Sequence, residues 1–195
     1  MTCIVGLEHD GKVYLGGDSA AVGEEGQQAC AITDSKVFVI DDMIFGFCGS
    51  FRAGQLIKYG LKIPQKSAGK SDMEFLVIDF VDAIRVLFHE KGCLKKENEE
   101  ETSPASFLIG YAGHLYYLDD DLHIGRVKEG YHSVGVGSDI SLGSLFSTED
   151  LIKDPKERLT IALQAAVKWS GNVRPPFNII CLEAQKPKTK SRNLR

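Results

Sequence analysis

Short apolar runs separated by polar turns dominate the first part of the chain. The run at residues 3–9 is followed by the pair Asp10-Gly11 and then by a second run at 12–18. An Asp-Gly pair between two such runs is typical of a tight hairpin, so we expect two antiparallel strands here. Because both runs are almost continuously apolar, we also expect both faces of their sheet to be covered by other elements.

Further short apolar runs indicate that this hairpin belongs to a larger β-rich unit. Turn residues such as Gly, Asp and Asn separate these runs, which favours strands over long buried helices. The additional strands are expected around residues 30–32, 36–40, 43–48, 105–111, 114–119, 122–127 and 177–183.

A first group of helices is predicted in the middle of the chain. One helix opens after Gly49-Ser50, and a longer amphipathic helix covers residues 72–91. The charged stretch at 95–104 follows and is expected to form an exposed loop. The apolar stripe of the longer helix is predicted to consist of Met73, Val77, Phe80, Val81, Ile84, Leu87 and Phe88.

A second helical group precedes the last strand, and the order of elements then indicates the fold. One helix is expected near 140–146, and another begins at Asp154, where a cap residue is followed by Pro and Glu. Clustered strands and paired helices favour an α+β fold, a four-layer αββα sandwich with the helices outside. A doubly wound parallel sheet is disfavoured because strands and helices do not alternate. We expect one domain over 1–185 and a basic, disordered tail at 186–195.

The first strand carries a residue with catalytic potential at its very start. Thr2 follows Met1 directly. Removal of Met1, which the small Thr side chain allows, would leave Thr2 with both a free α-amine and a β-hydroxyl. Such a residue is a nucleophile that carries its own base. We therefore expect a mature chain that starts at Thr2.

Several motifs around this residue resemble a known family. They are T-x-I-V-G at 2–6, D-G-K-V-x-x-G-G-D at 10–18, the following Lys36, and G-F-x-G at 46–49. Together they resemble N-terminal nucleophile (Ntn) hydrolases of the proteasome β-subunit and HslV type. The family has the four-layer sandwich fold, which agrees with the order of elements. The resemblance implies amide hydrolysis through an acyl-enzyme.

The resemblance also implies a role for each matching residue. Thr2 would be the nucleophile, and the positive charge of Lys36 would favour a neutral α-amine and help the hydroxyl to lose its proton. Asp18 would pair with Lys36 and hold it in place, so that neither buried charge is alone. The N–H of Gly49 would bind the developing oxyanion. Ser170 falls on the serine of the family motif D-x-x-S-G.

Two positions depart from the family pattern. The family carries G-S-G where this chain reads Gly135-Val136-Gly137, so the hydroxyl of the central residue is missing. The Asp of D-x-x-S-G is replaced by Val167. Ser138, which follows this segment directly, carries a hydroxyl, but its side chain could face away from the nucleophile. Part of the polar support around the nucleophile is therefore predicted to be absent.

Each candidate residue also has an ordinary structural explanation. Thr2 could be a strand residue, Asp18 the start of a turn, Lys36 a surface lysine and Gly49 a turn glycine. Only their joint occurrence in the family's order favours the catalytic reading. Cys3 is an alternative nucleophile, but it would require removal of two residues, and strand alternation directs it to the other face. The five histidines show no triad or metal-ligand spacing.

Composition narrows the remaining possibilities. The chain has 195 residues, is 43% hydrophobic and carries a net charge of −4, which suits one globular core and gives no reason to expect nucleic acid. Neither a membrane-spanning run nor a signal peptide is visible, so we expect a cytoplasmic location. The five cysteines are odd in number and lack C-x-x-C spacing, which indicates neither a disulfide framework nor a zinc site. We expect no cofactor and no metal.

The leading hypothesis is a cytoplasmic threonine peptidase of the proteasome and HslV type. The resemblance implies a ring-shaped homo-oligomer, peptide or unfolded-protein substrates, and an ATP-dependent unfoldase as a possible partner. Two alternatives remain open: a catalytically weak or inactive assembly protein of the same fold, and an Ntn amidohydrolase that acts on a small amide.

Overall fold

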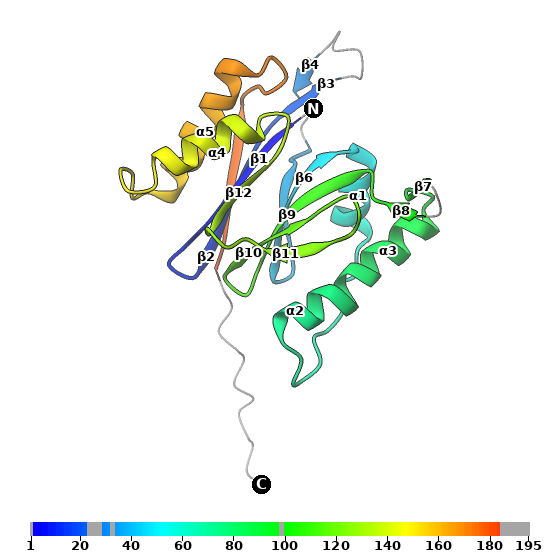
Figure 1. Ribbon diagram of the computed structural model, residues 1–195. Coiled ribbons are helices and arrows are strands. Elements are labelled where there is room, and N and C mark those ends of the chain that lie inside the picture. Colours follow the sequence, from blue (N-terminus) through cyan, green and yellow to red (C-terminus); the bar gives the residue numbers. More distant parts are fainter. Residues whose placement is uncertain (1, 23–28, 32–33, 98–99, 184–195) are drawn as a thin grey trace, which may run out of the picture.

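Two β-sheets lie face to face, and helices cover both outer sides (Figure 1). The computed structural model describes residues 2–22, 29–31, 34–97 and 100–183. The first sheet has the order β12-β1-β2-β13, and the second has the order β11-β10-β9-β6-β5. Helices α4 and α5 pack on the first sheet, and α1 and α3 lie on the outer side of the second. The predicted α+β, four-layer αββα sandwich is confirmed.

The elements have the following bounds. The first sheet consists of β1 (Cys3–His9), β2 (Lys12–Asp18), β12 (Tyr131–Gly135) and β13 (Phe177–Glu183). The second consists of β5 (Val37–Ile40), β6 (Met43–Gly49), β9 (Ala105–Tyr111), β10 (His114–Leu118) and β11 (Ile124–Arg126). The helical segments are α1 (Phe51–Gly60), α2 (Asp72–Glu74), η1 (Phe75–Phe80), α3 (Val81–Glu90), α4 (Ser138–Ser147) and α5 (Pro155–Trp169).

The hairpin at the start of the chain is formed as predicted. Strands β1 and β2 pair antiparallel, and Asp10 and Gly11 both adopt positive φ angles, of 50° and 70°. A two-residue turn with positive φ at both positions matches the twist of the strands, which explains the Asp-Gly pair. Strand β12, which pairs with the other edge of β1, was not predicted, because its residues 131–135 show no clear apolar alternation.

Both faces of the first hairpin are buried, which explains its nearly continuous apolar sequence. Side chains from alternate positions of β1 enter different apolar clusters. Ile4 lies between the two sheets, whereas Cys3 and Val5 pack under α4 and α5. A further cluster fills the space between the second sheet and α1, η1 and α3.

The long helix over residues 72–91 is confirmed in extent, but the predicted apolar stripe is wrong in its first half. Met73 and Val77 are 36% and 46% exposed, whereas Phe75 and Leu76 are buried. The cause is the π-helical segment η1, in which each turn holds more residues than an α-helix turn. The π-turn rotates the buried face, so that the core side chains of the helix are Phe75, Leu76, Phe80, Ile84, Leu87 and Phe88.

The charged stretch predicted as a loop forms a short hairpin instead. Strand β7 (Lys95–Glu97) pairs antiparallel with β8 (Glu100–Thr102). A second short hairpin, β3 (Ala20–Val22) with β4 (Ala29–Ala31), follows Asp18. The predicted tail at 186–195 lies outside the described residues.

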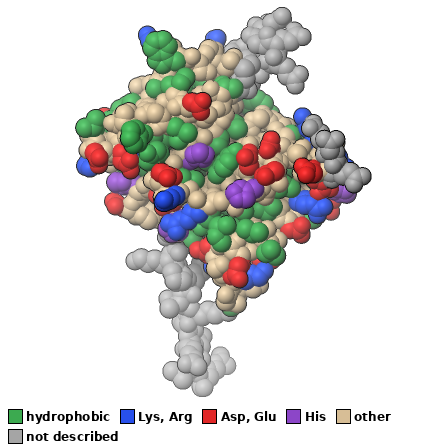
Figure 2. Space-filling model, in the orientation of Figure 1, with side chains coloured by type: hydrophobic (Ala, Val, Ile, Leu, Met, Phe, Trp, Pro, Cys, Tyr) green, Lys and Arg blue, Asp and Glu red, His purple; other side chains and the backbone are tan. Residues whose placement is uncertain are grey.

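Figure 2 shows acidic and basic side chains mixed over the surface, with apolar side chains between them. Large apolar side chains are exposed on both outer helical layers. Phe146 and Trp169 belong to α4 and α5, and Val77, Ile78 and Val86 belong to η1 and α3. No helix within the described residues is both long enough and apolar enough to cross a membrane.

Candidate active site

Three of the predicted site residues come from strand ends that meet at one edge of the sandwich. Thr2 precedes β1, Asp18 ends β2, and Lys36 precedes β5. The antiparallel pairing of β1 and β2 places the start of one beside the end of the other. Lys36 is tied to the second sheet, because its carbonyl oxygen accepts a hydrogen bond of 3.2 Å from the Phe47 N–H. The two sheets therefore bring all three residues together.

The Lys36 ammonium lies between the other two side chains. Its Nζ donates to Thr2 Oγ1 at 3.0 Å and to Asp18 Oδ1 at 2.9 Å. The three residues are almost fully buried, with exposed fractions of 2% for Thr2, 1% for Asp18 and 1% for Lys36. The expected contacts of Lys36 with Thr2 and with Asp18 are thus present, and Lys36 is not the surface lysine of the alternative explanation.

Backbone groups hold the Asp18 carboxylate in place. Oδ1 accepts a hydrogen bond of 3.0 Å from the Cys3 N–H, and Oδ2 accepts one of 3.0 Å from the Ala20 N–H. A buried carboxylate is tolerated when hydrogen bonds and an opposite charge satisfy it. Asp18 is therefore a fixed anchor that determines the position of Lys36.

The surroundings of Lys36 change its acidity. Burial lowers the pKa of the ammonium, and the charge of Asp18 opposes this shift without cancelling it. The Nζ also lies 5.7 Å from the centre of the Phe51 ring, at the start of α1. The charge of Asp18 and its hydrogen bond to Lys36 therefore favour the charged form that burial disfavours.

Gly49 occupies a turn that only glycine fits. Its φ is +98°, and a Cβ atom there would lie 2.6 Å from the Pro104 carbonyl oxygen. The next residue, Ser50, caps α1 by accepting a hydrogen bond of 3.3 Å from the Ala53 N–H. The predicted strand-to-helix turn is thus present at this position.

Gly135 links this turn to the start of the chain. A Cβ atom on Gly135 would lie 2.1 Å from the Thr2 carbonyl oxygen and 3.4 Å from Cys48 Cβ. Thr2 and Cys48 therefore both lie close to Gly135. Gly49 follows Cys48 directly, so the candidate oxyanion residue lies in the neighbourhood of Thr2.

Comparison with known proteins gives a consistent answer for the fold. No protein-family model matches the sequence, and no curated protein matches it. BPH from Thiobacillus denitrificans, solved in complex with epoxomicin, is similar in structure with a TM-score of 0.79 and 13% identity, over 95% of this chain and 100% of that chain. HslV from Trypanosoma brucei is similar with a TM-score of 0.66 and 18% identity, over 93% of this chain and 99% of that chain. Anbu from Yersinia bercovieri is similar with a TM-score of 0.66 and 10% identity, over 93% of this chain and 82% of that chain.

These structures are Ntn proteins of the proteasome β-subunit type. This chain has the proteasome β-subunit fold. At identities of 10% to 18%, the likeness establishes the fold alone. The chemistry of the site therefore depends on the residues of this chain.

Within the proteasome β-subunit fold, the segment Gly135-Val136-Gly137 is constrained at both glycines. A Cβ on Gly137 would lie 2.9 Å from Cys3 Cβ and 3.0 Å from Ala166 Cβ. Close packing therefore requires both glycines, whereas the Val136 side chain between them is 51% exposed. Ser138 Oγ lies 3.5 Å from its neighbour Asp139, at the start of α4. The central position of this segment thus presents a half-exposed apolar side chain, and the hydroxyl of the adjacent Ser138 lies next to Asp139.

The end of α5 carries the other departure from the family pattern. Val167 packs against the apolar cluster that contains Cys3. The Ser170 N–H donates to the Ala166 carbonyl oxygen at 2.8 Å and ends the helix. Among the described residues, no hydrogen bond joins the Ser170 hydroxyl to Thr2, Asp18 or Lys36. The predicted inclusion of Ser170 in the site therefore stays a prediction.

Cys3 lies on the opposite face of β1 from Thr2, as strand alternation predicted. Its Sγ is 3.0 Å from Ser141 Oγ and 3.8 Å from Ser133 Oγ. Burial is the main cause that raises the pKa of this thiol, which disfavours the reactive thiolate. Sequence reasoning did not identify the two serines, because they come from β12 and α4 and no local motif connects them with Cys3.

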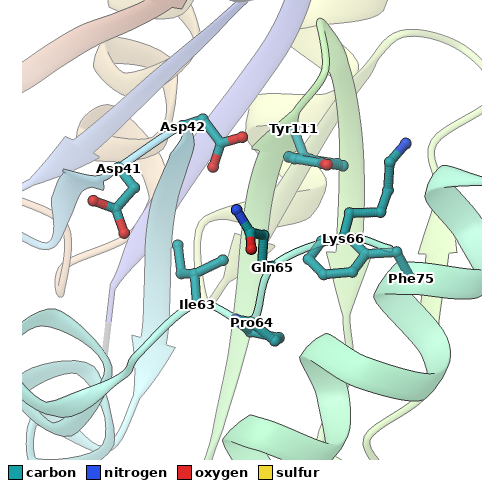
Figure 3. Close-up of a pocket in the computed structure, with 8 residues that line it drawn as sticks. All are labelled: Asp41, Asp42, Ile63, Pro64, Gln65, Lys66, Phe75 and Tyr111. Carbon is teal, nitrogen blue, oxygen red and sulfur yellow. The ribbon is translucent and has the colours of Figure 1, made fainter. Parts of the chain in front are cut away.

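A cavity of about 650 Å³ lies away from this site (Figure 3). Tyr111, Phe75 and the turn residues Asp41 and Asp42 are part of its lining. That turn precedes β6, whereas Gly49 ends β6, and a strand of this length spans roughly 20 Å. The cavity therefore belongs to the other end of the second sheet and contributes nothing to the chemistry at Thr2.

Proposed function

We propose that the protein is a threonine peptidase that uses Thr2 as its nucleophile after removal of Met1. The observation that carries this proposal is the buried hydrogen-bonded series in which Lys36 Nζ lies 3.0 Å from Thr2 Oγ1 and 2.9 Å from Asp18 Oδ1. The Lys36 ammonium is buried and contacts the Thr2 hydroxyl at the start of β1. It is suited to stabilising a developing alkoxide.

The first step is the attack of Thr2 on a substrate amide. Thr2 Oγ1 adds to the carbonyl carbon while its proton passes to the free α-amine, directly or through a water molecule. An α-amine has a pKa near 8, which suits a general base at neutral pH. The positive charge of Lys36, held by Asp18, favours the neutral amine and stabilises the oxygen as it loses its proton.

The next steps complete an acyl transfer. The negative charge that forms on the carbonyl oxygen is stabilised by the N–H of Gly49. Collapse of this intermediate breaks the C–N bond, and the amine leaves with the proton that the α-amine had accepted. Water then hydrolyses the ester on Thr2 Oγ1 by the same route and restores the free hydroxyl.

We also propose a homo-oligomeric ring that takes peptides or unfolded proteins and acts with an ATP-dependent unfoldase. The proteasome β-subunit fold supports assembly, as do the apolar side chains exposed on both outer helical layers, such as Trp169 at 75% and Ile78 at 61%. Cys3, Cys48, Cys93 and Cys181 are free thiols. Free thiols suit a reducing compartment, and we propose the cytoplasm.

A second candidate function is a catalytically weak or inactive assembly protein. Val136 and Val167 stand where the family carries a hydroxyl and a carboxylate, and Val167 lies in apolar surroundings. An α-amine without these partners is less well oriented, and poor orientation of a catalytic group costs on the order of 10²-fold in rate. The retained contacts of Lys36 favour a slow enzyme over an inactive one.

Hydrolysis of fluorogenic peptides by protein of known N-terminus tests this proposal. Intact mass spectrometry first establishes the fraction of chains that start at Thr2. We expect slow hydrolysis by the natural protein, residual hydrolysis by Thr2→Ser and none by Thr2→Ala. Hydrolysis of small amides but not of peptides would replace the peptidase by an amidohydrolase. Equal rates for Thr2→Ala and the natural protein would refute Thr2 as the nucleophile.

A further inference from the structure

A second, smaller cavity lies directly beside the candidate oxyanion residue. It has a volume of about 330 Å³, and Cys48 and Gly49 are part of its lining. Cys48 approaches Gly135, which also contacts the Thr2 carbonyl oxygen. The cavity therefore borders the proposed oxyanion residue, Gly49. Its volume is at the lower end of the range for ligand pockets, which suits one side chain better than a stretch of peptide.

The walls of this cavity are held in place by hydrogen bonds. The Ser103 N–H donates to the Asp120 carbonyl oxygen at 2.7 Å, and Ser103 Oγ donates to the Ala105 carbonyl oxygen at 2.6 Å. On the other side, the Ser50 N–H donates to the Pro104 carbonyl oxygen at 2.9 Å. The cavity is thus formed before any substrate binds, which lowers the entropic cost of binding.

The lining of the cavity is polar and electrically balanced. Thr102 and Ser106 are hydroxyl-bearing residues of this lining, and Lys95 and Asp120 are its two charged residues. Within the part of the chain that the structure describes, neither Lys95 nor Asp120 has an ion-pair partner. A charged ligand would be attracted by one of them and repelled by the other. A neutral group that both donates and accepts hydrogen bonds meets neither penalty.

We propose that this cavity is a substrate subsite that accepts a neutral polar side chain, such as that of Gln or Asn, next to the cleaved bond. The proposal rests on the proposed peptidase function and names the substrate class of the same site. Lys95 and Asp120 determine the selectivity, because each excludes side chains of its own charge. The subsite discriminates between charged side chains because it attracts one sign and repels the other. Removal of Lys95 or of Asp120 should therefore shift the preference between positive and negative substrate side chains in a defined direction.

Two matched variants test the selectivity in opposite directions. The substrates are fluorogenic peptides that differ only in having Gln, Glu, Lys or Leu at each position beside the cleaved bond. The natural protein should prefer Gln. Lys95→Met should raise the rate for Lys relative to Glu by about threefold or more, and Asp120→Asn should do the reverse, as expected for one screened charge within several ångströms. Equal preferences in all three proteins would overturn the proposal.

Labelling of Cys48 measures the charge of the cavity without any catalysis. The probes are an anionic sulfonatoethyl and a cationic trimethylammonioethyl methanethiosulfonate, with the site of labelling mapped by mass spectrometry and Cys48→Ala as the control. Lys95→Met should favour the cationic probe and Asp120→Asn the anionic one, each by about threefold. Shifts in labelling without shifts in peptide preference would show a charged surface and not a subsite, and would overturn the proposal. If labelling shifts but no protein hydrolyses any peptide, the proposed function fails, and the subsite with it.

Discussion

Thr2 and Cys3 are neighbours in the sequence, yet β1 directs their side chains to opposite sides of the first sheet. Thr2 faces a buried ammonium and carboxylate, with Lys36 Nζ at 3.0 Å from its hydroxyl. Cys3 faces the hydroxyls of Ser141 and Ser133 in otherwise apolar surroundings. A thiol is intrinsically the better nucleophile, but its surroundings keep it protonated. The surroundings of the two side chains, more than their intrinsic reactivity, therefore favour Thr2 over Cys3 as the nucleophile.

Removal of Lys36 should give the largest effect, because it takes away the polar contact of the Thr2 hydroxyl. Lys36→Ala is expected to lower hydrolysis on the order of 10²–10⁴-fold, because the developing alkoxide loses its only nearby ammonium among the described residues. It should also lower the free energy of unfolding by about 3–5 kcal/mol, because Asp18 is left as an unpaired buried charge. Peptide turnover and chemical denaturation measure the two effects.

The double variant Asp18→Asn/Lys36→Met separates these two effects. It removes both buried charges, so part of the lost stability should return while hydrolysis stays as low as in Lys36→Ala. Lys36→Arg should lose hydrolysis to a similar extent, because a wide planar guanidinium cannot replace a compact ammonium in this space. Turnover by Lys36→Ala within a few-fold of the natural rate would remove Lys36 from the mechanism.

A substitution at Gly135 should disturb the packing of the first sheet beside Thr2. In Gly135→Ala, the new Cβ would lie 2.1 Å from the Thr2 carbonyl oxygen, at a φ of +100° that disfavours alanine. We expect a loss of about 1–3 kcal/mol or more in the free energy of unfolding. Gly143→Ala is the matched control, since nothing lies within 4 Å of its Cβ and alanine suits the interior of α4. Equal stability of the two variants would contradict the close approach at Gly135.

The sequence predicted the strands more reliably than the details of the helices and loops. The first hairpin and α5 were predictable because Asp10-Gly11 and Asp154-Pro155 determine local geometry. The π-turn in η1 was not, because a periodicity of 3.6 residues carries no sign of one wider turn. The β7–β8 hairpin was missed because its charged residues have low strand propensity.

The residues of the candidate site were predictable, but their burial and their contacts were not. Nothing local distinguishes Lys36 from a surface lysine, because the partner that makes its burial possible, Asp18, comes from a different sheet. Only the resemblance to a family connected them in advance. The cavity beside Gly49 could not be predicted, because four separate segments form its walls.

Truncation of Cys3 tests the apolar side of the first sheet. Cys3→Ala is expected to leave peptide hydrolysis within a few-fold of the natural rate, because the thiol contacts none of the proposed catalytic side chains among the described residues. The free energy of unfolding should fall by about 1–2 kcal/mol, since Ser141 and Ser133 lose a buried partner. Turnover and denaturation of the same preparation measure both. Loss of hydrolysis on the scale of Lys36→Ala would indicate that the thiol takes part in catalysis.

The pH dependence of stability should show the smallest effect. Because the folded-state pKa of Cys3 is raised above 9.0, the folded chain holds a proton that the unfolded chain releases. The stability that this thiol contributes is present below pH 9.0 and is lost as the pH rises through its folded-state pKa. Cys48, whose pKa is raised by burial to about 11, acts in the same direction. Between pH 7 and 10.5, the free energy of unfolding, measured by chemical denaturation at each pH, should fall less steeply for Cys3→Ala than for the natural protein. Identical slopes would contradict the raised pKa of Cys3.

The dependence of turnover on the N-terminus tests most directly whether Thr2 acts through its own α-amine. Preparations that differ in the fraction of chains starting at Thr2, as measured by intact mass, are compared in the hydrolysis of one fluorogenic peptide. The rate per chain should rise in proportion to that fraction and extrapolate to zero for chains that retain Met1, because their Thr2 nitrogen is an amide and cannot accept a proton. A rate that is independent of the fraction, or a full rate in chains that retain Met1, would contradict the proposed mechanism.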